Sequence, residues 1–331
     1  LVKFVLLVIL KEKNPLKLLK LNMKILGIGN AIVDVICKVD ENFIVQNNLA
    51  KGNMKLIFDQ NEFEKLLSGL KIEKTISGGS VANSIVGLSQ QGNKVGFIGK
   101  VSNDKLGENY EIGLKKENVD YLYSKKRETL PTGTCLILIT PDSERTMCTF
   151  LGTAGKINER DINAEAVKNS NMIFLEGYLW DKGEPKKAFL KAINNANKVA
   201  MSLSDKFCVD RHKTDFLDLV KNKLDITFAN EEEFKSLINA DKFDDVIKFA
   251  KNIDKLIIIT RGEKGAISIK GDNIKEIGVK KDLSIVDLTG AGDLFASGYL
   301  HGYLNNFSQE DCLKKATEMS SKIIQQIGAR L

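Results

Sequence analysis

The chain has 331 residues, 43% of them hydrophobic and 28% charged, which suits a globular protein with a sizeable core in one large domain or two ordinary ones. Residues 1–22 hold five Lys and one Glu, so they contribute +4 of the net charge of +6, and the small remainder excludes nucleic acid as the main partner. Five scattered cysteines and two distant histidines support neither a disulfide framework nor a His-based metal site or triad. We expect a reduced, cytoplasmic setting.

Residues 1–22 combine a seven-residue apolar run, 4–10, with Lys-rich sequence. A bilayer-spanning helix needs about 20 apolar residues, and no small-residue cleavage site marks a secretory signal. We therefore expect an extension outside the fold, a functional chain starting near Met23, and no membrane partner. A membrane-surface helix is the minor alternative.

The segment 25–33 predicts a buried strand broken by glycines. Ile32 stands where a dinucleotide-binding fingerprint needs its third glycine, so that fingerprint is weak. Asn30 and Asp34 emerge among apolar neighbours at the end of this strand. They either cap a turn or face a ligand hydroxyl group, and the local pattern favours the cap.

A second glycine turn, Gly78-Gly79, permits close backbone approach, and Ser80 is placed to cap the helix that follows. Asn83 lies in the first turn of that helix and faces whatever the glycine turn admits. Small residues at positions 82, 84 and 87 predict that the helix packs tightly against a neighbour.

The runs 132–140 and 145–150, joined by Pro-Asp-Ser-Glu, predict a β-hairpin. Arg145 at the start of the second run is either a solvated charge at a sheet edge or an anion contact, and the local pattern favours the first.

Beyond residue 160, predicted strands at 172–176, 199–203, 226–229 and 256–260 alternate with helices such as 185–197 and 216–223. This rhythm predicts a mostly parallel sheet covered on both faces, in which ligands bind beyond the carboxyl ends of the strands. Four strand ends carry polar clusters there, which favours an active site: Asn30 with Asp34, Asn230 with Glu233, Thr260 with Gly262, and the motif 289–293.

That last motif follows a predicted strand end at 285–288 and reads Thr289-Gly290-Ala291-Gly292-Asp293. Glycines let successive N–H groups converge, and a helix N-terminus adds partial positive charge, which suits a phosphate. Asp293 is placed to take a proton from an attacking hydroxyl group. The alternative is a tight turn with an acid favoured by the helix dipole.

These motifs, in this order, resemble the ribokinase-like carbohydrate and nucleoside kinase family of pfkB type, over about residues 23–328. The resemblance implies an α/β fold with a doubly wound, mostly parallel sheet flanked by helices, and a small β lid from roughly 34–57 and 127–150. It also implies ATP-dependent transfer of the γ-phosphate to a primary hydroxyl group of a nucleoside or sugar. The motifs that carry it are Gly78-Gly79-Ser80 with Asn83, Asn230-x-x-Glu233, Thr260-x-Gly262-x-x-Gly265, and residues 287–293.

The resemblance also assigns roles. Asp293 is the base, and the N–H groups of Gly290, Ala291 and Gly292 form the anion hole. Asn230 and Glu233 organise Mg²⁺ through water. Residues expected to bind the acceptor are Asn30, Asp34, Gly78, Gly79, Ser80, Asn83 and Cys135. Residues expected to bind ATP are Arg145, Asn230, Thr260, Gly262, Gly265 and Thr289, Arg145 by matching a phosphate-binding arginine.

Within the family, segments such as 29–34 and 131–135 resemble the adenosine kinases, which implies conversion of adenosine to AMP in purine salvage. By that match Ile32, Leu56, Cys135 and Phe207 form an apolar slot for a purine. Leu288 and the segment 149–153 depart from that pattern. A kinase for ribose, fructose or a keto-deoxy sugar acid is therefore the alternative, and a non-catalytic nucleotide-binding protein is the remote one. A monomer and a homodimer both stay open, as does a monovalent cation near Asp287.

Overall fold

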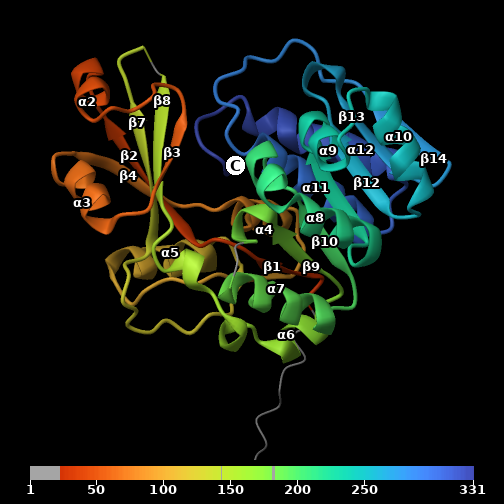
Figure 1. The fold of residues 1–331 in the computed structure, drawn as a ribbon, viewed down its shortest axis with the longest axis horizontal. Coiled ribbons are helices and arrows are strands. Elements are labelled where there is room, and N and C mark those ends of the chain that lie inside the picture. Colours follow the sequence, from red (N-terminus) through yellow and green to blue (C-terminus); the bar gives the residue numbers. More distant parts are fainter. Residues whose placement is uncertain (1–22, 143, 181–182) are drawn as a thin grey trace, which may run out of the picture.

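The computed structural model describes residues 23–142, 144–180 and 183–331, so the expected extension 1–22 lies outside the described residues. The chain forms a large α/β lobe and a smaller lobe built on a second sheet (Figure 1). The C-terminal end of the chain lies between the two lobes. No helix in the described ranges is long and apolar enough to cross a bilayer.

The large lobe is organised around a nine-stranded sheet. Seven consecutive strands of this sheet run parallel to one another, and the two strands at one end of the sheet are antiparallel. This confirms the predicted mostly parallel sheet. The spatial order is β14 (Asn273–Ile277), β13 (Ala266–Lys270), β12 (Leu256–Thr260), β11 (Ile226–Asn230), β10 (Val199–Ser202), β9 (Ile173–Glu176), β1 (Ile25–Ile28), β5 (Val95–Ile98) and β6 (Asp120–Tyr121).

Helices cover both faces of this sheet (Figure 1). Along β12, Ile258 packs into one core while Ile257 and Ile259 pack into the other, which explains why the strand is apolar at nearly every position. One face is covered by α4 (Ser80–Gln90), α5 (Lys105–Lys116), α11 (Ala291–Leu304) and α12 (Gln309–Ile323). The other is covered by α6 (Ala164–Lys168), α7 (Glu184–Asn195), α8 (Lys206–Asn222), α9 (Glu231–Ile238) and α10 (Phe243–Asn252).

The smaller lobe is a five-stranded sheet that includes the predicted β-hairpin. Its order is β3 (Met54–Ile57), β8 (Arg145–Phe150), β7 (Gly133–Ile139), β2 (Ile32–Lys38) and β4 (Ile72–Ser77), with α2 (Glu41–Gln46) and α3 (Gln60–Ser68) beside it. The predicted lid segments 34–57 and 127–150 contain most of four of these strands and leave out β4. Phe63 of α3 stacks on Phe150 at 5.3 Å between ring centroids, which fixes α3 against the sheet.

The predicted strand at 285–288 is wrong. Ile285 and Val286 are 64% and 53% exposed, and the N–H groups of Val286 and Asp287 donate to the carbonyl of Ile324 at 2.8 and 3.1 Å. The segment is therefore held by the end of α12 and has no partner strand among the described residues.

Helix α8 begins at Lys206, before the predicted helix 216–223, and it is kinked at His212, where the backbone is not helical (φ −121°, ψ 22°). The carboxylate of Asp205 accepts the N–H of Cys208 at 2.6 Å and so caps the helix ten residues earlier than the apolar pattern indicated.

The predicted tight packing of α4 is confirmed, and its partner is α11. A β carbon at Gly87 would lie 2.6 Å from Oγ of Ser297 and 2.7 Å from Cδ1 of Leu294. The two helices therefore approach more closely there than any larger residue would permit.

Candidate active site

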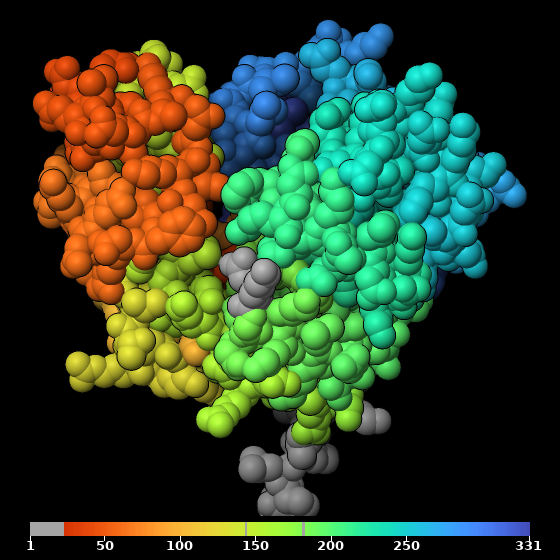
Figure 2. Space-filling view, in the orientation of Figure 1, coloured from red at the N-terminus to blue at the C-terminus, as the bar shows by residue number. Residues whose placement is uncertain are grey.

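A pocket with a volume of about 730 Å³ lies between the two lobes, and Figure 2 shows the hollow between the orange and the blue and green surfaces. Residues at the carboxyl ends of five parallel strands line it: Asn30 after β1, Glu176 of β9, Ser202 of β10, Asn230 of β11 and Thr260 of β12. Members of all four predicted polar clusters therefore line one pocket, although the cluster 289–293 follows no strand and Gly262 is not among the lining residues.

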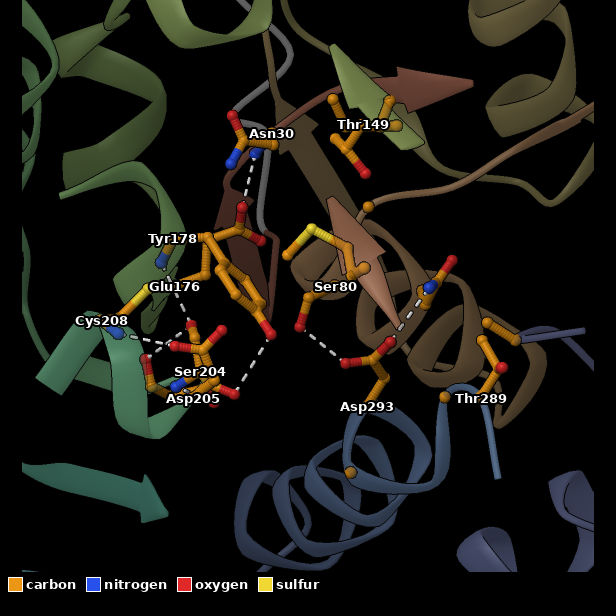
Figure 3. Close-up of a pocket in the computed structure, with 18 of the residues that line it drawn as sticks. Asn30, Ser80, Thr149, Glu176, Tyr178, Ser204, Asp205, Cys208, Thr289 and Asp293 are labelled. Atoms are coloured by element: carbon orange, nitrogen blue, oxygen red, sulfur yellow. Dashed lines mark hydrogen bonds between the residues drawn. The ribbon is translucent and has the colours of Figure 1, made fainter. Parts of the chain in front are cut away.

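Asp293 lies in the first turn of α11 and lines this pocket (Figure 3). Its Oδ1 accepts a hydrogen bond from the hydroxyl of Ser80 at 2.6 Å, and its Oδ2 accepts one from Nδ2 of Asn83 at 3.0 Å. Burial raises the pKa of the Asp293 carboxyl, and these two hydrogen bonds, together with the charge of Arg330, reduce that rise. A carboxylate held by two donors keeps lone pairs available for a substrate proton.

The expectation that Ser80 caps α4 is wrong. Ser80 is the first residue of the helix, Gly79 occupies the N-cap position with φ of +99°, and no side chain caps there. The hydroxyl of Ser80 is thus available to Asp293, 213 residues further along the chain.

Asp34 and Asn30 face the pocket, so their interpretation as turn caps is wrong. Burial raises the pKa of Asp34 from 3.8 to about 7, with the charge of Arg330 opposing the shift. Gly78 leaves room for this carboxylate, because a β carbon at position 78 would lie only 2.6 Å from Oδ2 of Asp34. Oδ1 of Asn30 is buried and has no hydrogen-bond partner among the described residues. This end of the pocket therefore offers acceptors to a ligand that carries hydroxyl groups.

Glu176 was not selected from the sequence, although a carboxylate directly after the apolar run 172–175 is a usable signal. It is 1% exposed and accepts the N–H groups of Asn30 at 2.8 Å and Val81 at 2.9 Å (Figure 3 draws the first). Burial raises its pKa to about 7. Glu176 thus ties the end of β1 to the start of α4 and fixes the acceptor end of the pocket.

The glycine motif also lines the pocket. Gly290 is the N-cap of α11 with φ of +78°, a left-handed conformation that favours glycine. The N–H of Ala291 donates to the carbonyl of Leu288 at 3.2 Å, whereas Gly292, next in the helix, has an N–H without a partner among the described residues. Of the three N–H groups expected to form an anion hole, that of Ala291 is thus already engaged.

Asp287, which precedes this motif, is saturated with donors. Its Oδ1 accepts from the N–H and hydroxyl of Thr289, and its Oδ2 accepts from the N–H of Gly328 and from Nη1 of Arg145 at 2.6 Å. Burial acts to raise the pKa of Asp287, but these hydrogen bonds and the charge of Arg145 lower it overall. A monovalent cation does not fit here, because Arg145 already supplies positive charge and the four donors fill the carboxylate.

Asn230 and Glu233 form a capping box at the start of α9. Glu233 is 4% exposed, and burial raises its pKa to about 7, with hydrogen bonds from Asn230 opposing the shift and the charge of Asp205 adding to it. The described residues contain no group of three side chains able to hold a metal directly. The carboxylates of Glu233 and Asp205, which both line the pocket, nevertheless fit a Mg²⁺ that keeps its water shell, since a cation would relieve their mutual repulsion.

The remaining predicted residues divide into two groups. Thr260, Thr289 and Cys135 line the pocket, whereas Gly262 and Gly265 are not among its lining residues. Gly265 has φ of +83°, and a side chain there would clash with the carbonyl of Ile277, so a tight turn before β13 accounts for this glycine. Arg145 reaches the glycine motif through Asp287.

A doubly wound sheet, a polar pocket at its strand ends and an acid beside a glycine-rich helix start define a kinase of the ribokinase-like class. Residues 45–331 match the model of the pfkB family carbohydrate kinases, and the chain belongs to this family. It is therefore an enzyme, a phosphotransferase with an alcohol group as acceptor.

Individual relatives differ in the substrate that their names give. A probable sugar kinase from Rhizobium etli CFN 42 is 36% identical, with a TM-score of 0.85 over 93% of this chain and 95% of that one. The adenosine kinase from Sinorhizobium meliloti is 35% identical, with a TM-score of 0.85 over 94% and 96%. A 5-dehydro-2-deoxygluconokinase from Clostridium beijerinckii is 29% identical over 294 residues, 82% of this chain and 85% of the relative.

Asp34→Asn tests the buried carboxyl. Native Asp34 keeps its proton up to a pH of about 7, whereas the unfolded chain loses it near 3.8, so its contribution to stability falls as the pH rises through this window. We expect the Tm of the variant minus that of the parent to increase by about 2–4 °C or more between pH 5 and pH 8, measured by thermal denaturation.

Asp142→Asn is the matched control, because ion pairing and hydrogen bonding lower the pKa of Asp142 to about 2 and leave it ionised across that range. A Tm difference for Asp34→Asn that stays constant from pH 5 to pH 8, as in the control, would show that Asp34 is not buried in this way.

Replacing K⁺ by tetramethylammonium tests the assignment at Asp287. Because Arg145 supplies the charge, we expect the rate of ATP-dependent phosphorylation at saturating Mg²⁺ to change by less than about twofold. Activation by K⁺ of about tenfold or more would contradict it.

Proposed function

We propose that the chain is an ATP-dependent adenosine kinase that converts adenosine to AMP. The observation that carries the proposal is the acceptor end of the pocket, where an apolar wall lies beside hydrogen-bond acceptors. A nucleoside needs both, since its base is flat and apolar on two faces and its ribose carries hydroxyl groups.

The apolar wall lies on the pocket face of the small sheet. Its members come from β2, β7, β8 and the adjoining loop: Ile32, Cys135, Ile137, Met147 and Leu151. Phe207 of α8 lines the same pocket from the large lobe with 64% of its surface exposed, and Leu56 of β3 also lines it. These residues include all four that were expected to form a purine slot.

The part of the pocket that binds the ribose hydroxyl groups lies between this wall and Asp293, the proposed catalytic base. Asp34 and the unpaired Oδ1 of Asn30 accept hydrogen bonds from the ribose hydroxyl groups. With the ribose held there, its primary hydroxyl group is directed toward Asp293 at the start of α11. Cys135 lines the apolar wall beside the purine and presents a neutral thiol there, because burial raises its pKa to about 12.

Phosphoryl transfer then proceeds by positioning and charge stabilisation. Asp293 accepts the proton of the primary hydroxyl group, the oxygen forms a bond to the γ-phosphorus, and the bond to the bridging oxygen breaks to release ADP. The N–H groups of Gly290 and Gly292 and the positive end of α11 stabilise the charge on the moving group. Arg145, held beside them by Asp287, supplies a further positive charge.

ATP lies along the large lobe in this proposal. Thr260 and Thr289 line its groove, and Glu233 and Asn230 would hold Mg²⁺ through water, where its charge would offset that of the phosphates.

The second candidate is a kinase for a keto-deoxy sugar acid, and Arg211 favours it. Arg211 is the one basic residue among the described residues that line the pocket, and a sugar acid needs a cation for its carboxylate. Its guanidinium lies 4.7 Å from the ring centroid of Phe207, on the α8 side. The name of the Clostridium beijerinckii relative agrees with this alternative.

A substrate panel with a Phe207→Ala variant separates the two. We expect kcat/KM for adenosine to exceed that for 5-dehydro-2-deoxygluconate and for ribose by at least about 100-fold in the parent. Loss of base stacking in Phe207→Ala should lower kcat/KM for adenosine by about tenfold, as measured by ADP release.

Phe58→Ala is the matched control, because Phe58 is 83% exposed and is not among the residues lining the pocket. Turnover of the sugar acid with none of adenosine, abolished by Arg211→Met, would establish the second candidate and overturn the first.

Asp293→Asn tests the base. The amide preserves shape and cannot accept the proton, so kcat should fall by about three orders of magnitude or more while KM for ATP changes little. Initial rates and a thermal shift with ATP measure the two effects. A variant that phosphorylates as fast as the parent would remove Asp293 from the role of base.

A further inference from the structure

Arg330 lies outside every motif considered above, yet it contacts Asn83, which is hydrogen-bonded to the proposed base Asp293. Its Nε donates to Oδ1 of Asn83 at 3.0 Å, and Nδ2 of the same amide donates to Asp293 at 3.0 Å. An arginine has only donors, so this contact forces the oxygen of Asn83 toward Arg330 and its NH₂ group toward Asp293. We propose that Arg330 is a positioning residue for phosphoryl transfer, acting through Asn83 to orient Asp293.

The chain around Arg330 is placed for this role. The N–H of Gly328 donates to Asp287 at 2.8 Å, and Ala329 lines the pocket and packs on Gly290, where a β carbon would lie 2.7 Å from Cα of Ala329. The consecutive residues 328–330 thus contact Asp287, the helix cap Gly290 and Asn83 in turn. Figure 1 shows this end of the chain between the two lobes.

One nitrogen of the Arg330 guanidinium group lacks a hydrogen-bond acceptor. Nη2 of Arg330 is buried and has no partner among the described residues. A buried donor without a partner costs free energy, so a purely structural contact would not favour an arginine here. Its positive charge instead acts on Asp34 and Asp293, the two acids between which the acceptor hydroxyl is placed.

The backbone holds the side chain in place. Nε2 of Gln326 donates to the carbonyl of Arg330 at 2.7 Å, and Nε2 of Gln90 donates to the carbonyl of Leu331 at 3.0 Å. Because these bonds involve main-chain oxygens, they do not depend on the guanidinium, and substitution of Arg330 leaves them available.

A double-mutant cycle tests the proposal. Arg330→Met should lower kcat by about 30-fold, with KM for ATP and for the acceptor within about threefold of the parent, because orientation of the base matters in the transition state and not in binding. In an Asn83→Ala background the same substitution should lower kcat by less than about threefold, since the route through Asn83 is already absent. Arg330→Lys, which keeps the charge without the planar guanidinium, should fall between parent and Arg330→Met.

Lys322→Met on α12 is the matched control, because it removes the same charge from a side chain that pairs only with Glu318 among the described residues. A parent-like kcat in Arg330→Met, or equal losses in both backgrounds of the cycle, would overturn the proposal. If Arg330→Met does not fold, Arg330→Lys in the same cycle decides, with a loss of about fivefold expected in the parent background alone.

The proposal rests on the proposed role of Asp293, not on adenosine, so the assay uses whichever acceptor the parent phosphorylates. An active Asp293→Asn would reject the base itself. An inactive Asp293→Asn beside a parent-like Arg330→Met would reject Arg330 alone.

Discussion

The close contact between α4 and α11 is the constraint on which the site depends. Gly87 lets the two helices approach, and this approach brings the hydroxyl of Ser80 and the amide of Asn83 onto the carboxylate of Asp293. The hydroxyl of Ser84 adds a bond to the backbone carbonyl of Asp293 at 2.9 Å. Two helix starts are thereby locked together by polar contacts across a packed interface, so the carboxylate is oriented before any substrate binds. Such preorganisation is what an enzyme that works by positioning requires.

Buried acids set the electrostatics of the pocket. Burial raises the pKa of Asp34, Glu176 and Glu233 to about 7 each, and it raises that of Asp293. Burying carboxyl groups costs free energy unless donors or cations compensate them. Under the proposed function, hydroxyl groups of the acceptor and the Mg²⁺ that accompanies the nucleotide would provide that compensation, which would couple ligand binding to the charge state of the pocket.

The sequence predicted the site where the signal was local and failed where it was not. Polar residues directly after apolar strands, such as Asn230 and Thr260, share one pocket because parallel strands end at one edge of a sheet. The hydrogen bond of Ser80 depends on a residue 213 positions away, so its local pattern indicated a helix cap instead. The segment 285–288, in which only Asp287 is buried, has no partner strand among the described residues, and Arg330 lies in a short segment with no periodicity or motif. Long-range packing, which no local pattern records, decides each of these.

The two ends of the pocket come from different parts of the fold, and this separates chemistry from specificity. Strand ends of the large lobe and the start of α11 supply Glu176, Glu233, Asp293 and the glycine motif, whereas the small sheet supplies Asp34 and the apolar wall. Along β2, Ile32 and Asp34 line the pocket while Val33 and Val35 pack into the core. Under the proposed function, substitutions of the apolar residues on this face are expected to change the choice of acceptor more than the chemistry at Asp293. The relatives named above differ in the acceptor that their names give, and under the proposed function the acceptor of this chain is inferred from the side chains of that one face.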